Sequence, residues 1–220
     1  MRYFTADLHI GDKTIARWRG FDDVAEHDDV ILAGLCRRVT AEDELWLLGD
    51  LCTSTVAGVT ALREAIPCGR VHVVVGNHDS RAKFVTAGCF DTVDYYAEVG
   101  RVKTDGYKFI MSHYPMLDWD RAYHGSFMLH GHIHSLPTDA ESGRFQEGFE
   151  APAVGRVPSP PDRDHGGMGM RGYNAWNREH AIRRFDVGVD ANGYRPVSAE
   201  ELVAWLPSEV WTAAHGLPVD

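Results

Sequence analysis

The amino-acid sequence predicts an α/β fold, and three observations lead to this expectation. Between residue 1 and about residue 134, short apolar or β-branched runs are bounded by Gly, Asp or His, as buried strands are. Longer stretches between these runs place apolar residues three or four positions apart, as amphipathic helices do. The chain has 220 residues, of which 44% are hydrophobic, which suits one domain with a proper core. We therefore expect residues 1–220 to form a single domain.

The expected elements of this first part follow in order along the chain. The short apolar runs that predict strands are Tyr3–Ala6, Leu45–Leu48, Val71–Val75, Phe109–Ser112 and Phe127–Leu129. The stretches that predict amphipathic helices are Asp22–Arg38 and Val56–Ile66, where charged residues fill the positions between the apolar ones. Strands and helices thus alternate, as they do in α/β proteins.

A Gly/Pro-rich segment interrupts the domain after the last of these strands. Residues 135–178 show little periodicity and contain the run VPSPPDRDHGGMGMRGYN, so we expect an inserted loop. It is either a surface insertion that the fold tolerates or a lid that selects the substrate. Beyond it, Ala181–Val189 is predicted as a strand and Ser198–Trp205 as a helix, with Ser198 as N-cap and Glu201 three residues on.

Composition and charge narrow the classes of function. A formal net charge of −10 argues against a protein that holds long duplex nucleic acid, because such proteins present a basic face. No apolar run approaches the roughly 18 to 20 residues of a membrane helix. The N-terminal residues MRYFTADLHIGD lack the apolar stretch of a signal peptide, so we expect a cytoplasmic protein without a membrane partner. The four cysteines form no C-x-x-C pair and are interpreted as small hydrophobic residues, although Cys52 lies two residues after a candidate metal ligand.

Residues that bind metals well stand at the ends of five predicted strands. Because ligand groups gather at the carboxyl ends of strands in open α/β folds, we expect these side chains to converge. Singly, each has an ordinary explanation as a turn residue or a satisfied polar group. In strand order they are Asp7 and His9, then Asp50, then Asn77, His78 and Asp79, then His113, and finally His130, His132 and His134.

In a cluster without cationic partners, carboxylates would repel one another and imidazoles would lack hydrogen-bond partners, both at a cost in free energy. A divalent cation bound among them removes that cost. Mn²⁺, Fe²⁺ and Zn²⁺ all accept mixed oxygen and imidazole donors. The candidate ligands are too many for one tetrahedral zinc, but they suit two ions that share one carboxylate: Asp7, His9, Asp50, Asn77, His113, His132 and His134. Two ions roughly 3.5–4 Å apart suit in-line displacement at phosphorus.

The order of these motifs resembles the calcineurin-like metallophosphoesterase superfamily. Its pattern D-x-H, G-D, G-N-H-D, a lone H and G-H-x-H is present over about residues 3–134 as Asp7-Leu8-His9, Gly49-Asp50, Gly76-Asn77-His78-Asp79, His113 and Gly131-His132-Ile133-His134. More narrowly, the stretches SHYPM, LHGHIH and FDVGVDANGYRPVS resemble a subgroup of small phage and bacterial phosphoesterases. The resemblance lapses over residues 135–178.

This resemblance implies two mixed β-sheets packed as a sandwich and flanked by helices, with a dimetal site at one edge. Carried over position by position, it implies that one ion is bound by Asp7, His9 and His134 and the other by Asn77, His113 and His132, with Asp50 as the bridge. A hydroxide between the ions would attack phosphorus. His78 would be catalytic, stabilising the transition state and protonating the leaving oxygen, with orientation of a ligand as its alternative role. Asp79 would support the ligands. For the two divalent ions we expect Mn²⁺ first, with Fe, Zn, Ni or Co as alternatives.

The expected reaction is hydrolysis of a small phosphate ester. We favour a phosphodiester, with a small cyclic nucleotide among the candidates, because no extra basic cluster is evident for a dianionic monoester. The alternatives at the same site are a phosphomonoesterase and a nuclease, and from another class a metal-free protein-binding scaffold. Candidates for lining a phosphate pocket are Tyr114, Arg19 and Arg121, for each of which a surface role is the alternative. The sequence leaves the oligomeric state open.

Overall fold

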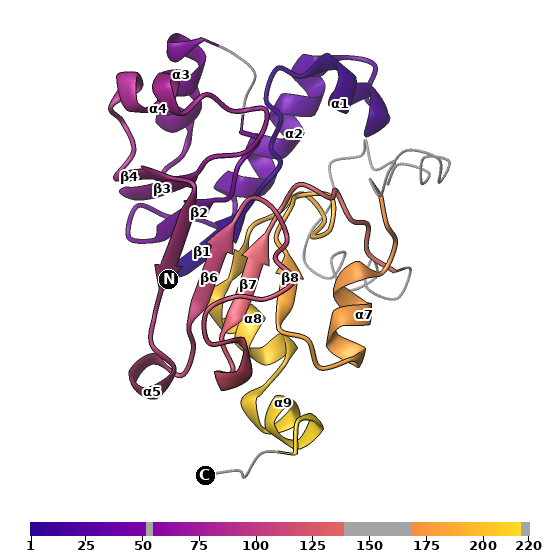
Figure 1. Ribbon diagram of the computed structural model, residues 1–220. Coiled ribbons are helices and arrows are strands. Elements are labelled where there is room, and N and C mark those ends of the chain that lie inside the picture. Colours follow the sequence, from indigo (N-terminus) through magenta and orange to yellow (C-terminus); the bar gives the residue numbers. More distant parts are fainter. Residues whose placement is uncertain (52–54, 139–168, 217–220) are drawn as a thin grey trace.

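The computed structural model describes residues 1–51, 55–138 and 169–216, and within them the chain forms two mixed β-sheets flanked by helices (Figure 1). The first sheet has the strand order β4 (Thr92–Asp94), β3 (Arg70–Val74), β2 (Glu44–Leu47), β1 (Arg2–Thr5) and β9 (Val197–Ser198). The second has the order β5 (Tyr96–Val99), β6 (Phe109–Ser112), β7 (Phe127–His130) and β8 (Arg184–Asp186). The α/β class and the two mixed sheets are confirmed.

Strand direction brings the carboxyl ends of both sheets to one edge. Strands β1 to β4 are mutually parallel, as are β6, β7 and β8, whereas β9 and β5 run antiparallel at the margins. A parallel bridge between Ala6 and Gly188 joins the chain after β1 to the chain after β8. The segments that follow β1, β2, β3, β6 and β7 therefore meet where the sheets meet.

Two apolar clusters hold this arrangement together. One lies between the sheets, where Phe4 packs edge-on to Phe109 at 5.0 Å between ring centroids and Phe109 lies 5.4 Å from Phe127. Leu202 of α8 (Ala199–Trp205) joins this cluster. The other cluster packs the remaining face of the first sheet against α2 (Val24–Cys36), α3 (Val56–Ala65) and α4 (Arg81–Ala87). Such close packing fixes the strand ends, and with them the side chains that follow.

The longer expected elements are confirmed in type and position. Helix α2 begins after Asp23, whose carboxylate accepts a hydrogen bond from the N–H of Ala25. Helix α3 coincides with the predicted stretch to within one residue. The Ser198 side chain accepts from the N–H of Glu201, whose own carboxylate accepts from the N–H of Ser198, so the expected capping box forms at α8. Among the described residues, five further short helices were not predicted: α1 (Lys13–Trp18), α4, α5 (Val102–Asp105), the 3₁₀ turn η1 (Ala122–His124) and α9 (Ser208–Ala214).

Two expectations for the C-terminal part hold only in part. The end of the expected loop forms a helix, α7 (Tyr173–Glu179), whose buried residues are Asn174 and Asn177. Because its buried side is polar, hydrophobic periodicity cannot reveal this helix. The expected strand Ala181–Val189 is confirmed over Arg184–Asp186, which form β8. Just beyond it, Gly188 donates its N–H to the Asp186 carboxylate and forms a parallel bridge with Ala6 instead.

Two further expectations concern residues that the structure does not describe. Most of the Gly/Pro-rich segment, residues 139–168, lies outside the described part of the chain, as does Cys52. Whether that segment is a surface insertion or a lid therefore stays a prediction. In the described residues, none of the helices has the length and apolar character needed to cross a bilayer.

Candidate metal centre

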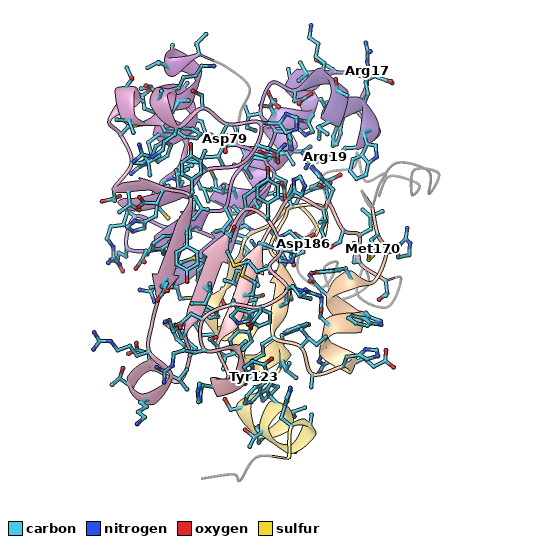
Figure 2. The ribbon with its side chains drawn as sticks, in the orientation of Figure 1. Arg17, Arg19, Asp79, Tyr123, Met170 and Asp186 are labelled. Atoms are coloured by element: carbon cyan, nitrogen blue, oxygen red, sulfur yellow. The ribbon has the colours of Figure 1, made fainter. Side chains whose placement is uncertain are left out.

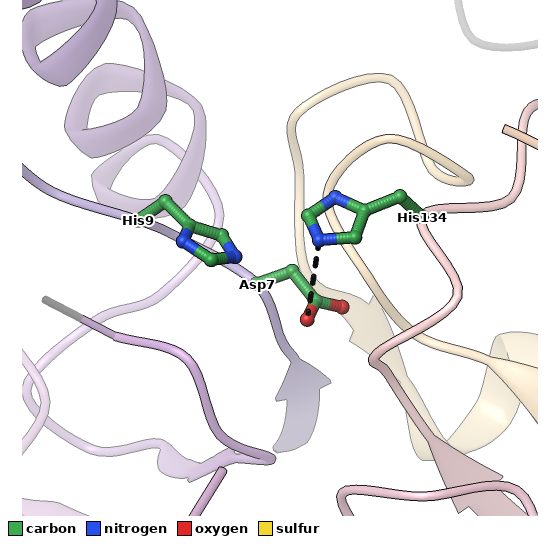
Figure 3. Close-up of side chains that lie close together, drawn as sticks. All are labelled: Asp7, His9 and His134. Atoms are coloured by element: carbon green, nitrogen blue, oxygen red, sulfur yellow. Dashed lines mark ion pairs between the residues drawn. The ribbon is translucent and has the colours of Figure 1, made fainter. Parts of the chain in front are cut away.

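The first group of candidate ligands consists of Asp7, His9 and His134 (Figure 3). All three side chains are buried, and each offers a ligand atom within 4.8 Å of the others. Asp7 and His9 follow β1, whereas His134 follows β7 in the other sheet. The Nε2 atom of His134 lies 4.0 Å from Oδ1 of Asp7, the contact that is dashed in Figure 3. The meeting of the two sheets therefore assembles this group.

The second group consists of Asp50, His113 and His132, which likewise offer atoms within 4.8 Å of one another. The amide oxygen of Asn77 lies 2.9 Å from Nε2 of His113 and 2.9 Å from Nδ1 of His132, so it belongs to the same cluster. Asp50 follows β2 and Asn77 follows β3, both in the first sheet. His113 follows β6 and His132 follows β7, both in the second sheet. The seven expected ligands thus lie in two adjacent groups.

Asp50 lies between the two groups. Its Oδ2 atom is 3.6 Å from Nε2 of His9 in the first group and 3.3 Å from Nε2 of His113 in the second. Its other oxygen, Oδ1, accepts a hydrogen bond from the N–H of His78 at 2.8 Å. One carboxylate oxygen is consequently free to face both imidazoles at once.

Left-handed backbone conformation is concentrated at these residues. Non-glycine residues rarely adopt positive φ, because each such residue costs about 1–3 kcal/mol and persists only where its surroundings hold it. Here the loops are held by backbone hydrogen bonds of 2.9 Å from Asp7 to the Gly49 carbonyl and from His9 to the Asp50 carbonyl. The candidate ligands with positive φ are Asp7 (58°), His9 (51°), Asp50 (55°), His132 (74°) and His134 (46°). Strain of this kind is typical of functional sites.

Glycines in the motifs allow the ligands to approach the backbone closely. A Cβ atom at Gly76 would overlap the Asp50 carboxylate, and one at Gly131 would overlap the Asp7 carboxylate. A side chain at either position would push a candidate ligand away, which explains why glycine stands in G-N-H-D and G-H-x-H.

Asp79 anchors the two loops that carry Asp50 and Asn77. Its carboxylate accepts hydrogen bonds from the N–H groups of Asp50 (2.7 Å), Leu51 (3.0 Å) and Gly76 (2.9 Å). The expected supporting role of Asp79 therefore has defined partners, all of them backbone groups.

The sequence did not predict the residues behind His134. Its Nδ1 atom lies 2.8 Å from Oδ2 of Asp190, a buried residue that also forms an ion pair with Arg19. A carboxylate cannot donate, so Nδ1 carries a hydrogen, and Nε2 is the ring atom that faces Asp7 and is left to bind a metal ion. Asp190 stands in the stretch FDVGVDANGYRPVS, which the sequence marked by resemblance without a role for any single residue.

Arg19 does not line a phosphate pocket, contrary to one interpretation of the sequence. Its side chain is fully buried, and all five of its N–H groups have acceptors. The acceptors are both oxygens of Asp190, the carbonyls of Asp7 and Leu8, and a ring nitrogen of His27. Figure 2 labels Arg19 in the upper part of the molecule.

Arg121, His124 and His130 also lie apart from the two groups. Arg121 borders a cavity with Lys108, next to the amino end of β6, whereas His113 follows the carboxyl end of that strand. His124 belongs to η1 directly after it, and Figure 2 shows the neighbouring Tyr123 far from Arg19 and Asp79. His130 is fully buried, its ring nitrogens contacting the Gly131 carbonyl and the Tyr173 hydroxyl at 2.8 and 3.0 Å.

The chemistry of the first group fits a metal ion. Neither ring nitrogen of His9 has a hydrogen-bond partner among the described residues, although both are buried. Burial, together with the nearby His134 and Arg19, lowers the pKa of His9 to about 3, so its imidazole is neutral at physiological pH. A buried neutral imidazole without a partner leaves a polar group unsatisfied, and a cation would satisfy it.

The second group provides an acceptor that stays ionised. Burial acts to raise the pKa of Asp50, but the hydrogen bond and charge of His113, together with the His78 N–H, hold it down at about 2. Asp50 is therefore a carboxylate across the physiological range. The carbonyl of Leu48 lies 2.9 Å from Nδ1 of His113 and fixes the hydrogen there, which directs Nε2 towards Asp50 and Asn77.

His78 is separate from both groups, although it adjoins them. It is exposed, and its ring lies 5.3 Å from that of His9 between centroids. The contact of its backbone N–H with Asp50 places it beside the carboxylate that faces both groups. An exposed imidazole next to buried donors is available to a bound substrate.

Comparisons with known proteins agree with this geometry. A family profile described as the calcineurin-like phosphoesterase superfamily domain matches residues 4–148. The Gene 66 proteins of Mycobacterium phages L5 and D29 are 28% and 31% identical over 159 and 160 residues, which is 60% of this chain and 77% and 78% of theirs. The crystal structure of a protein of unknown function from Aquifex aeolicus superposes with a TM-score of 0.61 at 21% identity, covering 93% of this chain and 98% of that one. The last likeness concerns the fold alone.

Proposed function

Since this chain belongs to the calcineurin-like phosphoesterase superfamily, we propose that the metal-dependent phosphoesterase it forms hydrolyses phosphodiesters at a pair of divalent ions. The family and the two buried groups together indicate a dimetal site. Both sheets contribute donors to it, which supports our further proposal that residues 1–220 form one catalytic domain. A small cyclic nucleotide is one diester of the proposed class.

The proposed ligand sets follow from the two groups. Asp7, His9 and His134 would hold one ion, and Asn77, His113 and His132 would hold the other. The observation that carries the proposal is the position of Asp50, whose Oδ2 atom faces His9 at 3.6 Å and His113 at 3.3 Å. A carboxylate oxygen between two such groups suits a bridging role. Because carboxylate and amide oxygens accompany the imidazoles, we propose Mn²⁺ as the ion.

The two ions, when bound, would lower the pKa of a water molecule and neutralise charge on the phosphate oxygens. Hydrolysis of a diester forms one bond between phosphorus and water oxygen and breaks one ester bond. The leaving oxygen then needs a proton, which His78 would donate because its exposed ring adjoins the first group. Asp79 and Asp190 would keep the surrounding loops and the His134 ring in place.

The preference for a diester rests on charge. A monoester dianion carries one more negative charge than a diester and gains more from a cationic side chain with free donors. Arg19, the arginine packed behind the first group, uses all five N–H groups on protein acceptors. It therefore has no donor left for a phosphate oxygen.

A hydrolysis screen with Mn²⁺ tests this function. The substrates are p-nitrophenyl phosphate, bis(p-nitrophenyl) phosphate, 2′,3′- and 3′,5′-cyclic nucleotides, and oligonucleotides, with the His78→Ala variant purified identically to exclude contaminating enzymes. We expect the bis-ester or a cyclic nucleotide to have the highest kcat/KM. A higher value for the monoester would make the protein a phosphomonoesterase, and cleavage of oligonucleotides alone would make it a nuclease. No hydrolysis, with well below one ion bound per chain, would favour the metal-free scaffold.

A further inference from the structure

Two partly exposed aromatic side chains flank the metal centre, one against each group of ligands. Trp18, at the end of α1, lies 5.5 Å from the ring of His134 in the first group, with the ring planes at 73°. Tyr114 lies 4.5 Å from the ring of His132 and 5.2 Å from that of His113 in the second group. Each aromatic ring thus contacts a proposed ligand while part of it remains open to solvent.

The position of Trp18 is fixed by its neighbours along the chain. Ile15 and Ala16 bury the inner side of α1, and Asp12 caps the helix by accepting from the N–H groups of Thr14 and Ile15. Arg19, directly after Trp18, is tied by four of its five hydrogen bonds to the loop that carries Asp7 and to Asp190. Trp18 is therefore held in place beside the first group before any substrate arrives.

Tyr114 is held in a comparable way and is more exposed. It directly follows His113, which is buried and bound to the Leu48 carbonyl at 2.9 Å. Its own side chain remains 49% exposed although it touches two imidazoles. Large aromatic residues dominate packing energetics when buried, so a preorganised and half-exposed ring at a reaction centre is well suited to contact a ligand.

We propose that Trp18 and Tyr114 form two flanking subsites that each receive a planar aromatic substituent of the phosphodiester. This inference rests on the proposed function and names its substrate class: diesters whose two substituents present flat rings, as nucleosides and aryl groups do. Phosphorus would sit between the two groups, near Asp50, so that the two ester substituents extend to opposite sides. A monoester or a cyclic nucleotide, each with a single flat ring system, would fill only one of the subsites.

Stacking between aromatic rings determines how much each subsite should strengthen binding of the substrate. Contact of one aromatic group with an aromatic side chain strengthens binding about 5- to 100-fold, largely independently of which ring is bound. An electron-withdrawing aryl substituent also makes phosphorus more reactive than a methyl substituent does, with or without these side chains. The subsites are therefore measured by the part of the preference that is lost when the two aromatic side chains are removed.

Two esters with the same leaving group test the proposal. Bis(p-nitrophenyl) phosphate and methyl p-nitrophenyl phosphate both release p-nitrophenolate and differ only in the substituent that stays on phosphorus. We expect the Mn²⁺-loaded protein to prefer the first by about tenfold or more in kcat/KM. The double variant Trp18→Leu/Tyr114→Leu should lose most of that preference, and the variant Trp18→Phe/Tyr114→Phe, which keeps planar rings, should retain it.

Matched controls replace aromatic residues elsewhere on the surface. Tyr123 is 76% exposed at η1, and Trp176 is 49% exposed on α7, where it stacks on His180 rather than on a proposed ligand. Tyr123→Leu and Trp176→Leu should leave the preference for the bis-ester unchanged. Bound Mn²⁺ per chain is measured for every variant, because a role limited to supporting the histidines would appear as lost metal.

Binding provides a readout that does not require turnover. Calorimetric titration with diphenyl phosphate and with dimethyl phosphate should show tighter binding of the diphenyl ester, weakened about tenfold or more in the double Leu variant. The proposal of two subsites would be overturned if the double Leu variant still preferred the diphenyl ester to the same degree. It would also be overturned if that variant lost metal and bound both esters equally weakly. If the metal-loaded protein hydrolyses neither nitrophenyl ester, the proposed function fails, and the titration alone then decides whether aromatic groups bind here.

Discussion

Oδ2 of Asp190 lies 2.8 Å from Nδ1 of His134, which orients a proposed metal ligand from behind. The same carboxylate forms a bidentate pair with the guanidinium of Arg19, at 2.8 and 2.7 Å. Although burial opposes ionisation of Asp190, the charges of Arg19 and His134 hold its pKa well below its usual range. The buried ion pair between Asp190 and Arg19 thus supports His134 of the candidate metal centre.

Replacing Asp190 with Asn tests this arrangement. Asn keeps the size of the side chain but removes the charge, so Arg19 would remain buried without its counter-ion. Breaking a buried pair in this way costs about 3–5 kcal/mol in the free energy of unfolding. Loss of the contact behind a ligating His weakens metal affinity about 10- to 100-fold. Urea denaturation and Mn²⁺ titration measure the two effects.

The matched control is Asp120→Asn. Asp120 pairs with Lys108 at 2.5 Å, but its side chain is 51% exposed and lies next to the opposite end of β6. An exposed pair contributes about 0–1 kcal/mol, so this variant should bind Mn²⁺ normally and lose little stability. Wild-type metal affinity in Asp190→Asn would show that Asp190 does not support the site.

His113 should release a proton when metal binds. Burial acts to lower its pKa, but the hydrogen bond to Asp50 and the charges of Asp7 and Asp50 outweigh it and raise the pKa to about 9. At about pH 7.5 the metal-free protein therefore carries a protonated His113, whereas a metal ligand must be neutral. Metal affinity should accordingly rise with pH up to about pH 9.

Calorimetry detects this proton directly. Titration of Mn²⁺ at about pH 7.5 in two buffers with different ionisation enthalpies should therefore give different observed enthalpies. The difference should correspond to the release of about one proton or more, because, although burial acts to lower the pKa of His134, Asp7 and Asp190 raise that pKa as well. Equal enthalpies in both buffers would mean that His113 is neutral before the metal arrives, or that it is not a ligand.

His78→Ala should separate catalysis from metal binding. Removing a general acid lowers turnover about 10²- to 10⁴-fold. Because His78 is exposed and lies outside both ligand groups, bound metal per chain should stay near the wild-type value. His124→Ala removes another exposed histidine, on η1, and should leave turnover unchanged. A parallel loss of metal and turnover in His78→Ala would assign His78 to the ligand shell instead.

Asp50→Asn should weaken the binding of both ions. The variant keeps an oxygen near His9 and His113 but removes the charge that both ions would share. Metal titration followed by elemental analysis should show reduced occupancy at both sites, with turnover falling in proportion. Loss of only one ion per chain would contradict the bridging role.

The sequence predicted that the candidate ligands lie close together, because their positions follow from strand order. Parallel strands that end at one edge bring Asp7, Asp50 and His113 together even though they are far apart along the chain. The spacing of the motifs was therefore enough to predict most residues of the candidate site. The left-handed backbone conformation of Asp7 and His9 could not be predicted from the motifs, because neither residue type requires positive φ.

The sequence did not predict that Arg19 and Asp190 pair behind the candidate ligands, and the reason is a different one. Arg19 and Asp190 are 171 residues apart, and neither belongs to a local pattern that indicates burial. An arginine is usually exposed, so the sequence favoured a surface or pocket role for Arg19. Likewise, the polar buried side of α7 gave no helical periodicity. Such tertiary pairings require the three-dimensional structure.

The most direct test of the paired-ion site is a crystal structure of the protein grown with Mn²⁺. Anomalous density should reveal two peaks roughly 3.5–4 Å apart, one among Asp7, His9 and His134 and the other among Asn77, His113 and His132, with Asp50 contacting both. A single peak that Asp50 does not touch, or no density between these side chains, would contradict the account.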